Sequence, residues 1–381
     1  MSGSVATTAA PRARVRPPFR ADHVGSLLRP RDLQAARTEW KAGRLSREAL
    51  REVEDRCIVR AITRQEEIGL RAATDGEYRR AFWHYDFVSG LDGVELYEPE
   101  QKIEFKGGVP LPLSLRVTGK IGWSRPVMIE DYRFLASHVR TSVPKQTIPS
   151  PSVVHFRGGR RAIDASTYPE LTPFFHDVAE AYHKAVAAFG EAGCRYLQID
   201  EVNIAYLCDP GQIETLKARG EHVEGLLGIY ADLLNRAIEA RTQEMTISMH
   251  LCRGNFRSTW VAQGGYEPVA EVLFNQINAD AYFMEYDTDR AGGFEPLRFV
   301  PRGEKIVVLG LVTSKSGALE TKDELKRRIE AASRFLPLEQ LALSPQCGFA
   351  STEEGNTLTE EEQWAKLRLC VEVAQEVWGS I

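Results

Sequence analysis

Short apolar segments alternate with longer helix-favouring segments along most of this chain. The candidate strands are eight apolar segments: 19–26, 70–76, 146–154, 194–200, 245–252, 279–285, 305–311 and 338–344. The helical patterns between and after them cover 31–69, 170–192, 211–241, 266–276, 321–335 and 359–378. Apolar strands that alternate with helices are typical of a parallel sheet covered by helices. Eight such units predict an α/β fold of the (β/α)8 TIM-barrel type.

An open, doubly wound sheet is the alternative arrangement of such units. It normally shows a G-x-G-x-x-G turn after an early strand, and this sequence has neither that turn nor a Walker A motif. The length of 381 residues suggests two or three domains at ~150 residues each, but one barrel can occupy all of it. We therefore expect a single barrel domain over residues 19–381.

Two stretches fall outside the alternation of strands and helices. Residues 1–18 are rich in Ala, Thr, Arg and Pro, and we expect them to form a disordered tail. Residues 90–125 are rich in Gly and Pro with alternating side chains, which predicts a β-hairpin insertion in the barrel.

Charge and cysteine content exclude several classes of protein. The 48 basic and 53 acidic residues give a net charge of −5, which argues against a nucleic-acid partner. No run of 18 apolar residues is present, so we expect no membrane partner, and the first residues lack the apolar core of a secretory signal. Six cysteines are too few for a disulfide-dense secreted fold. We expect a cytoplasmic protein with reduced thiols.

Polar residues gather where the predicted strands end. In a parallel barrel the chemistry lies at the carboxyl ends of the strands, and apolar strands need no polar tips for packing. The residues at or just after these ends are Ser26, Glu77, Asp200, Glu201, His250, Cys252, Glu285 and Cys347. Asp200 and Glu201 also fit a plainer role as caps of the helices that follow. The collection as a whole indicates a functional site.

The most informative pattern among these residues is His250-x-Cys252. Alternate residues of a strand point to the same side, so an imidazole and a thiolate can reach one metal ion. With Glu285 and Cys347 they form a His-Cys-Glu-Cys set, and two thiolates favour Zn²⁺ over magnesium or calcium. The competing interpretation is a chance pattern in which the cysteines are small buried hydrophobes.

Other reactive residues receive plainer interpretations. We expect the remaining cysteines to serve as packing: Cys57, Cys194, Cys208 and Cys370. Five arginines follow predicted strands, and we expect them on solvated faces rather than in an anion pocket: Arg79, Arg80, Arg157, Arg160 and Arg161.

The motifs around these residues resemble the catalytic domain of cobalamin-independent methionine synthase. The matching pieces span residues 19–380 and are DHVGSLLRP, ATDGE, YLQIDE, MHLC, YFMEYD and SPQCGF. The resemblance implies a (β/α)8 barrel whose zinc ligands are His250, Cys252, Glu285 and Cys347. It also implies that Ser26 holds the carboxylate of homocysteine and that Glu77 and Asp200 hold its ammonium group. It assigns no catalytic residue beyond the zinc site.

The implied activity is a zinc-dependent S-methyltransferase of the 5-methyltetrahydropteroyltriglutamate–homocysteine methyltransferase type, which serves methionine biosynthesis. A small thiol is activated as its thiolate and then methylated. The family's folate-stacking Trp is replaced by residues 148–152 (IPSPS), and its proposed general-acid His by residues 311–314 (LVTS). The full-length enzyme also has a second barrel, for which 381 residues leave no room. The resemblance therefore leaves three donors open: a folate, a corrinoid protein or an epoxide.

Three further functions are compatible with the sequence. The first is that of a related zinc branch, the epoxyalkane:coenzyme M transferases, which join epoxides to a thiol that bears a sulfonate. The acids Glu77 and Asp200 suit an amino-acid thiol better, because a sulfonate calls for Arg or Lys. The second is a non-catalytic barrel that binds zinc or thiols. The third is a metal-free barrel like uroporphyrinogen decarboxylase, which the H-x-C motif and Cys347 disfavour.

Overall fold

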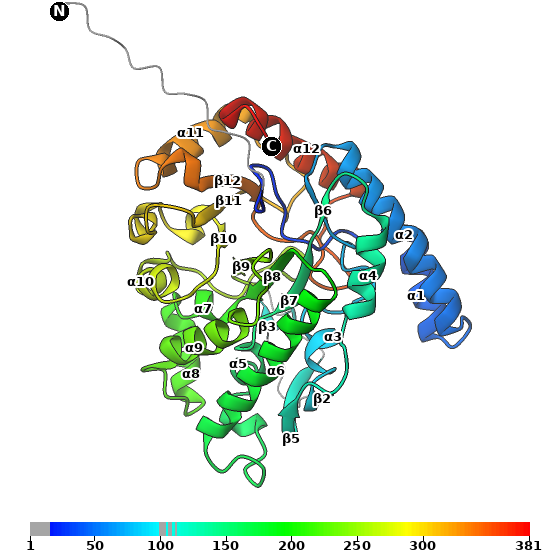
Figure 1. Ribbon diagram of the computed structural model, residues 1–381, viewed down its shortest axis with the longest axis vertical. Helices are drawn as coiled ribbons and strands as arrows, with labels where there is room; N and C mark the ends of the chain where they lie inside the picture. The colour runs from blue at the N-terminus through cyan, green and yellow to red at the C-terminus, as the bar shows by residue number, and fades with distance from the viewer. Residues whose placement is uncertain (1–15, 99–103, 106–108, 111–112) are drawn as a thin grey trace, which may run out of the picture.

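The centre of the molecule is a parallel sheet, shown in Figure 1 with helices packed around it. The computed structural model describes residues 16–98, 104–105, 109–110 and 113–381. Six neighbouring strands of the sheet are parallel, in the order β12, β11, β10, β9, β8 and β7. Their bounds are β7 (Gln146–Pro149), β8 (Tyr196–Glu201), β9 (Thr246–Leu251), β10 (Ala281–Glu285), β11 (Ile306–Val312) and β12 (Leu341–Pro345). Every residue of these strands is buried, as expected for a sheet covered on both faces.

Two further positions close this sheet into a barrel. β1 (Ala72–Ala73) pairs in parallel with β6 (Val143–Pro144), and Lys145 alone separates β6 from β7. β6 and β7 therefore make one barrel position, which begins and ends earlier than the predicted strand over 146–154. β7 ends at Pro149, which still pairs with Asp200, and Pro151 cannot continue the ladder, since proline has no N–H to donate.

The extended segment 19–26 takes the remaining position, beside β12. It forms an isolated parallel bridge between Ala21 and Leu343 rather than the regular strand predicted for it. The N–H of Asp22 donates to the carbonyl of Leu343 at 3.0 Å, and the hydroxyl of Thr74 donates to the carbonyl of Gly25 at 2.6 Å. The segment thus links β12 to the chain after β1. The fold is the α/β barrel of (β/α)8 type that the sequence predicts.

Helices fill the connections between the strands. The longer ones are α1 (Arg31–Lys41), α2 (Arg47–Glu67), α4 (Ile129–His138), α6 (Leu171–Glu191), α8 (Pro210–Ala218), α9 (Leu226–Ile238), α10 (Glu267–Asn275), α11 (Lys322–Ser333) and α12 (Glu360–Trp378). Short helices follow three strand positions: α3 (Tyr85–Val88), α5 (Val153–Phe156) and α7 (Asn203–Tyr206). Four 3₁₀ turns complete the set: η1 (Arg160–Ala162), η2 (Asp289–Ala291), η3 (Glu295–Phe299) and η4 (Leu338–Gln340).

Two predicted helices are each broken in two. The pattern over 31–69 divides into α1 and α2, because Gly43 has a φ of 70° and Ser46 caps α2 by accepting from the N–H of Ala49. The pattern over 211–241 divides into α8 and α9, where Gly220 and Gly225 have φ values of 84° and 81°. Glycine adopts such left-handed conformations without strain, so each break costs little.

An antiparallel hairpin lies within the stretch 90–125. β2 (Asp92–Tyr97) pairs with β5 (Ser114–Gly122), and the short strands β3 (Glu104–Phe105) and β4 (Val109–Pro110) pair farther out. The rest of that outer part, 99–103, 106–108 and 111–112, lies outside the described residues, as do residues 1–15 of the predicted tail. Figure 1 shows β2 and β5 at the edge of the barrel, next to α3.

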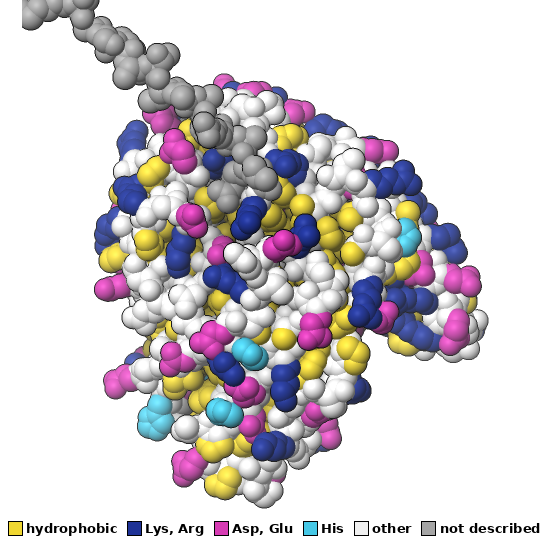
Figure 2. All heavy atoms as spheres, viewed as in Figure 1, with side chains coloured by type: hydrophobic (Ala, Val, Ile, Leu, Met, Phe, Trp, Pro, Cys, Tyr) yellow, Lys and Arg dark blue, Asp and Glu magenta, His cyan; other side chains and the backbone are white. Residues whose placement is uncertain are grey.

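The face of the molecule in Figure 2 carries charges of both signs. Figure 2 shows basic and acidic side chains interspersed over the face in view, in keeping with the small net charge. Among the described residues, no helix combines the length and the apolar character needed to span a membrane.

Candidate metal centre

Four buried side chains meet at the carboxyl end of the barrel. His250 lies in β9 and Cys252 follows that strand directly, while Glu285 ends β10 and Cys347 follows β12 by two residues. One potential ligand atom from each residue lies within 4.8 Å of all the others. The structure therefore brings together the whole His-Cys-Glu-Cys set that the sequence suggests.

The spacing of the two thiols suits one shared metal ion. The Sγ atoms of Cys252 and Cys347 lie 3.5 Å apart, too far for a disulfide bond. Two sulfurs on one tetrahedral zinc, each at ~2.3 Å, lie roughly 3.8 Å from one another. The imidazole of His250 supports the same arrangement, because neither of its nitrogens makes a hydrogen bond of ordinary geometry among the described residues. A buried imidazole without partners fits a ligand position.

The two thiols differ in how easily they ionise. The pKa of Cys347 is lowered well below its usual value, first by the hydrogen bond with Cys252 and further by His250. These effects outweigh burial, which would raise that pKa. The same hydrogen bond and burial raise the pKa of Cys252. One thiolate is thus favoured before any cation arrives, which is the form that binds metal.

Glu285 is held as a carboxylate by its surroundings. Burial alone would raise its pKa, but the positive charges of Lys315, Arg290 and Arg253 outweigh burial and lower it. Its Oε1 accepts from the N–H of Arg253 and its Oε2 from Nη2 of Arg290, both at 2.9 Å. Arg290 gives this carboxylate a second stable partner besides a metal ion.

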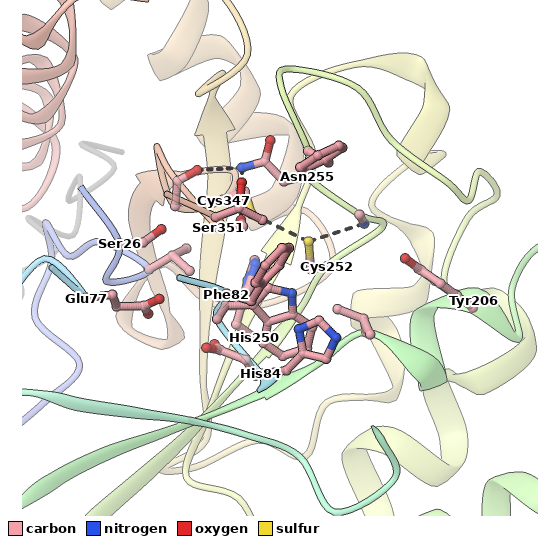
Figure 3. A pocket seen from close by; sticks show the side chains of 18 of the residues that line it. Ser26, Glu77, Phe82, His84, Tyr206, His250, Cys252, Asn255, Cys347 and Ser351 are labelled. Atoms are coloured by element: carbon pink, nitrogen blue, oxygen red, sulfur yellow. Dashed lines mark hydrogen bonds between the residues drawn. The ribbon is translucent and has the colours of Figure 1, made fainter. Parts of the chain in front are cut away.

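Three of the four candidate ligands, His250, Cys252 and Cys347, line a pocket, and Figure 3 shows part of its lining. The three residues predicted to bind the thiol substrate all line it: Ser26, Glu77 and Asp200. The carbonyl of Ser26 accepts from the N–H of Phe349 at 2.9 Å, which joins the start of the chain to the loop after Cys347. This contact places Ser26 beside the metal centre.

Glu77 and Asp200 are buried acids, each with a partner on one oxygen: Nη1 of Arg80 lies 3.5 Å from Oε1 of Glu77, and Nε2 of Gln198 donates to Oδ1 of Asp200 at 2.7 Å. Oε1 of Glu77 accepts from the hydroxyl of Thr147 at 2.8 Å, while Oε2 is buried without a hydrogen bond among the described residues. Glu77 also has a φ of 60°, a strained conformation that costs of order 1 kcal/mol and that tends to occur at functional sites. Burial, with the charge of Glu77, raises the pKa of Asp200 to about 7. Two buried acids of this kind are suited to receive a cation.

Glu201 has the plainer role of a helix cap that its sequence position also allows. Its Oε1 accepts from the N–H groups of Asn203 at 2.6 Å and Ile204 at 2.9 Å, which caps α7. Its Oε2 accepts from the hydroxyls of Ser150 and Ser152. Glu201 therefore ties the turn after β7 to the end of β8.

Replacing Glu201 with Gln should destabilise the barrel by about 1–3 kcal/mol, because an amide cannot accept all of these buried hydrogen bonds. Equilibrium unfolding in urea measures the free energy of unfolding of each variant. Glu244→Gln is the matched control, since Glu244 forms an exposed ion pair with Arg195, worth at most ~1 kcal/mol. A Glu201→Gln protein as stable as the wild type would contradict this role.

Sequence reasoning missed the second half of the pocket. The lining also includes Phe82, His84, Arg157, Val202, Tyr206, Asn255 and Phe256. The prediction that all five arginines lie on solvated faces is wrong for three of them, since Arg79, Arg80 and Arg157 are buried. A charge in a sequence carries no sign of burial, and only the position after a strand end hinted at the site.

The similarity of this chain to known proteins extends over the barrel. The family model described as the cobalamin-independent synthase catalytic domain matches residues 19–376. The chain belongs to this family.

Members of the cobalamin-independent synthase family resemble this chain over most of its length. Bacillus subtilis YxjG, an uncharacterized protein, is 50% identical over 365 residues, which are 96% of each chain. A Listeria monocytogenes crystal structure, assigned as a putative vitamin-B12 independent methionine synthase, has a TM-score of 0.78 and 41% identity, and covers 96% of this chain and 100% of its own. The methionine synthase of Saccharolobus solfataricus is 24% identical over 327 residues, 85% of this chain and 86% of its own.

Proposed function

We propose that the chain is a zinc-dependent methyltransferase that methylates the sulfur of a small, homocysteine-like thiol. The observation that carries this proposal is the His-Cys-Glu-Cys cluster beside a pocket lined by two buried acids, Glu77 and Asp200, where Oε2 of Glu77 has no hydrogen bond among the described residues. Membership of a methionine-synthase-like family supports the methyltransferase class.

The donor set decides which metal the cluster suits. Two thiolates, an imidazole and a carboxylate are ligands that zinc prefers, and a zinc ion there would lower the pKa of a thiol that joins it. His250, Cys252, Glu285 and Cys347 would hold the ion. Arg290 provides a place for the Glu285 carboxylate when the substrate thiol needs room, since the two groups already pair at 2.9 Å.

The remaining residues bind and orient the thiol substrate. Glu77 and Asp200 hold an ammonium group through charge-assisted hydrogen bonds, while Ser26 lies beside the amino-acid carboxylate. The sulfur then forms a bond to the methyl carbon, and the bond from that carbon to the donor breaks with its electron pair. Fixing both reactants in line supplies much of the rate enhancement.

Two positions differ from what the family resemblance implies for folate binding. Val312 is fully buried in β11 and has no proton to transfer, and residues 148–152 offer no aromatic ring for stacking. The Saccharolobus solfataricus relative, 86% of which is covered by the match, is nevertheless named a methionine synthase. The single-barrel form thus agrees with methionine synthesis, and a folate and a corrinoid protein both stay candidate donors.

One observation favours a second candidate, a thiol alkyltransferase of the epoxyalkane:coenzyme M type. Arg157 is a buried cation that lines the pocket, and a cation is what a sulfonate thiol requires. Calorimetric titration of zinc-loaded protein with homocysteine and with coenzyme M separates the candidates. Binding of homocysteine supports our proposal, and preference for coenzyme M supports the second candidate. Binding of neither thiol would leave a non-catalytic barrel.

An activity screen then identifies the donor. Zinc-loaded protein with the bound thiol is offered methyl-tetrahydrofolate, methylcobalamin and a small epoxide in turn. We expect a methylated thiol with one of the methyl donors. Product from the epoxide alone would contradict the proposed methyl transfer.

A further inference from the structure

Three of the polar side chains that line the pocket have no role in the proposed methyl transfer: His84, Arg157 and Tyr206. All three are buried, with exposed fractions of 1%, 5% and 2%. Burying polar groups costs free energy unless they find partners, so each of them needs an explanation.

Arg157 is a buried charge without an opposite charge. Within the described part of the chain no carboxylate pairs with it, and its Nε has no hydrogen-bond partner. Glu221, which follows α8 and contacts the loop after Arg157, accepts instead from the N–H of Arg160 at 2.9 Å and approaches Nε2 of His155 at 3.5 Å. A guanidinium in this position is suited to bind an anion through two parallel hydrogen bonds.

Tyr206 and His84 add neutral hydrogen-bonding groups beside this charge. The hydroxyl of Tyr206 forms no hydrogen bond of ordinary geometry among the described residues, and neither do the two ring nitrogens of His84. Burial and the charge of Arg157 hold the pKa of His84 well below its usual value, so this ring is neutral. Arg157 also faces Tyr206, since its charge opposes the rise in the pKa of Tyr206 that burial causes.

The scaffold holds these groups in place. Arg219 donates to the carbonyls of Phe156 and Arg157 at 3.1 and 3.3 Å, which fixes the loop that carries Arg157. The ring of His84 lies between those of Trp83 and Tyr85, with centroid distances of 4.4 and 3.8 Å. Groups held in this way are organised for a ligand before it binds.

Tyr206 lies on a different side of the pocket from two of the proposed thiol residues. Figure 3 shows Ser26 and Glu77 on one side of Cys252 and Tyr206 on the other. A thiol anchored through its amino-acid group at Glu77 thus leaves the side of Tyr206 to the second reactant.

We propose that Arg157, Tyr206 and His84 form an oxyanion-binding subsite for the group donor, which therefore carries a carboxylate, sulfonate or phosphate close to its reacting carbon. This proposal rests on the proposed function, because it assigns the opposite side of the pocket to an amino-acid thiol. It adds a requirement on the donor that methyl transfer alone does not impose.

The test measures anion binding to zinc-loaded protein saturated with homocysteine. Acetate, methanesulfonate and inorganic phosphate are titrated in turn by calorimetry at constant ionic strength. We expect the wild type to bind at least one of them with one site per chain, and Arg157→Met to weaken that binding at least ~10-fold, the loss of a charged hydrogen bond. Arg157→Lys should restore part of the affinity, because it keeps the charge without the planar fork.

Arg161→Met is the matched control, since Arg161 is an exposed arginine of the same loop. It should bind the anions as the wild type does. Thermal melting checks that each variant is folded. The measured zinc content and homocysteine affinity separate a failure of this proposal from a failure of the proposed function.

Three outcomes would overturn the subsite. The first is that no probe anion binds the wild type, and the second is that Arg157→Met binds it unchanged. The third is competition in zinc-loaded protein without bound thiol: if homocysteine or coenzyme M then displaces the anion in an Arg157-dependent manner, the subsite belongs to the thiol and not to the donor.

Discussion

The double variant Cys252→Ser, Cys347→Ser is expected to contain no zinc and to lose at least ~10³-fold in methyl transfer, about 4 kcal/mol of transition-state stabilisation. Both sulfurs belong to one buried cluster, and serine hydroxyls bind zinc poorly in place of thiolates. Elemental analysis of protein purified with zinc present measures the metal, and product formation with the identified donor measures the activity.

Cys57→Ser is the matched control for this variant. Cys57 is equally buried, but it lies in α2, where its Sγ contacts Asp32 at 3.6 Å and Arg60 at 3.2 Å. Its replacement should keep the zinc content and the activity of the wild type. If the double variant kept stoichiometric zinc, the metal would have to bind outside this cluster.

The second large effect concerns the two acids of the pocket. Glu77→Gln and Asp200→Asn should each weaken homocysteine binding by ~10–100-fold, because each removes a charge-assisted hydrogen bond to the ammonium group. Their zinc content should not change. Calorimetry on zinc-loaded protein measures the affinity.

A homocysteine analogue without the amino group makes this experiment specific. 4-Mercaptobutyrate keeps the thiol and the carboxylate, so both substitutions should change its binding much less than that of homocysteine. An equal loss for the two thiols would mean that Glu77 and Asp200 act on the shape of the pocket rather than on the ammonium.

The architecture was predictable because the strands are nearly continuous apolar runs. Each of the eight segments occupies a barrel position, although the segment 19–26 forms only a bridge at Ala21. Helix ends were less predictable: the division between α8 and α9 depends on backbone conformation at Gly220 and Gly225 that a hydrophobic pattern does not reveal.

The metal cluster was predictable for a related reason. Parallel strands place their carboxyl ends at one edge of the barrel, so polar residues at strand ends converge whatever their separation along the chain. Arg157 and Tyr206 were missed, because they lie on short loop helices and turns whose direction follows from tertiary contacts. One such tertiary contact is that of Glu201 with Ser150 and Ser152, which fixes the turn after β7 that leads to Arg157.

X-ray absorption at the zinc edge tests the central claim most directly. It is measured on protein purified with zinc available and quantified by elemental analysis. We predict about one zinc per chain, bound by two sulfur atoms and by nitrogen or oxygen atoms for the rest, as His250, Cys252, Glu285 and Cys347 would supply. Protein that stays free of zinc, or zinc without sulfur neighbours, would contradict the account.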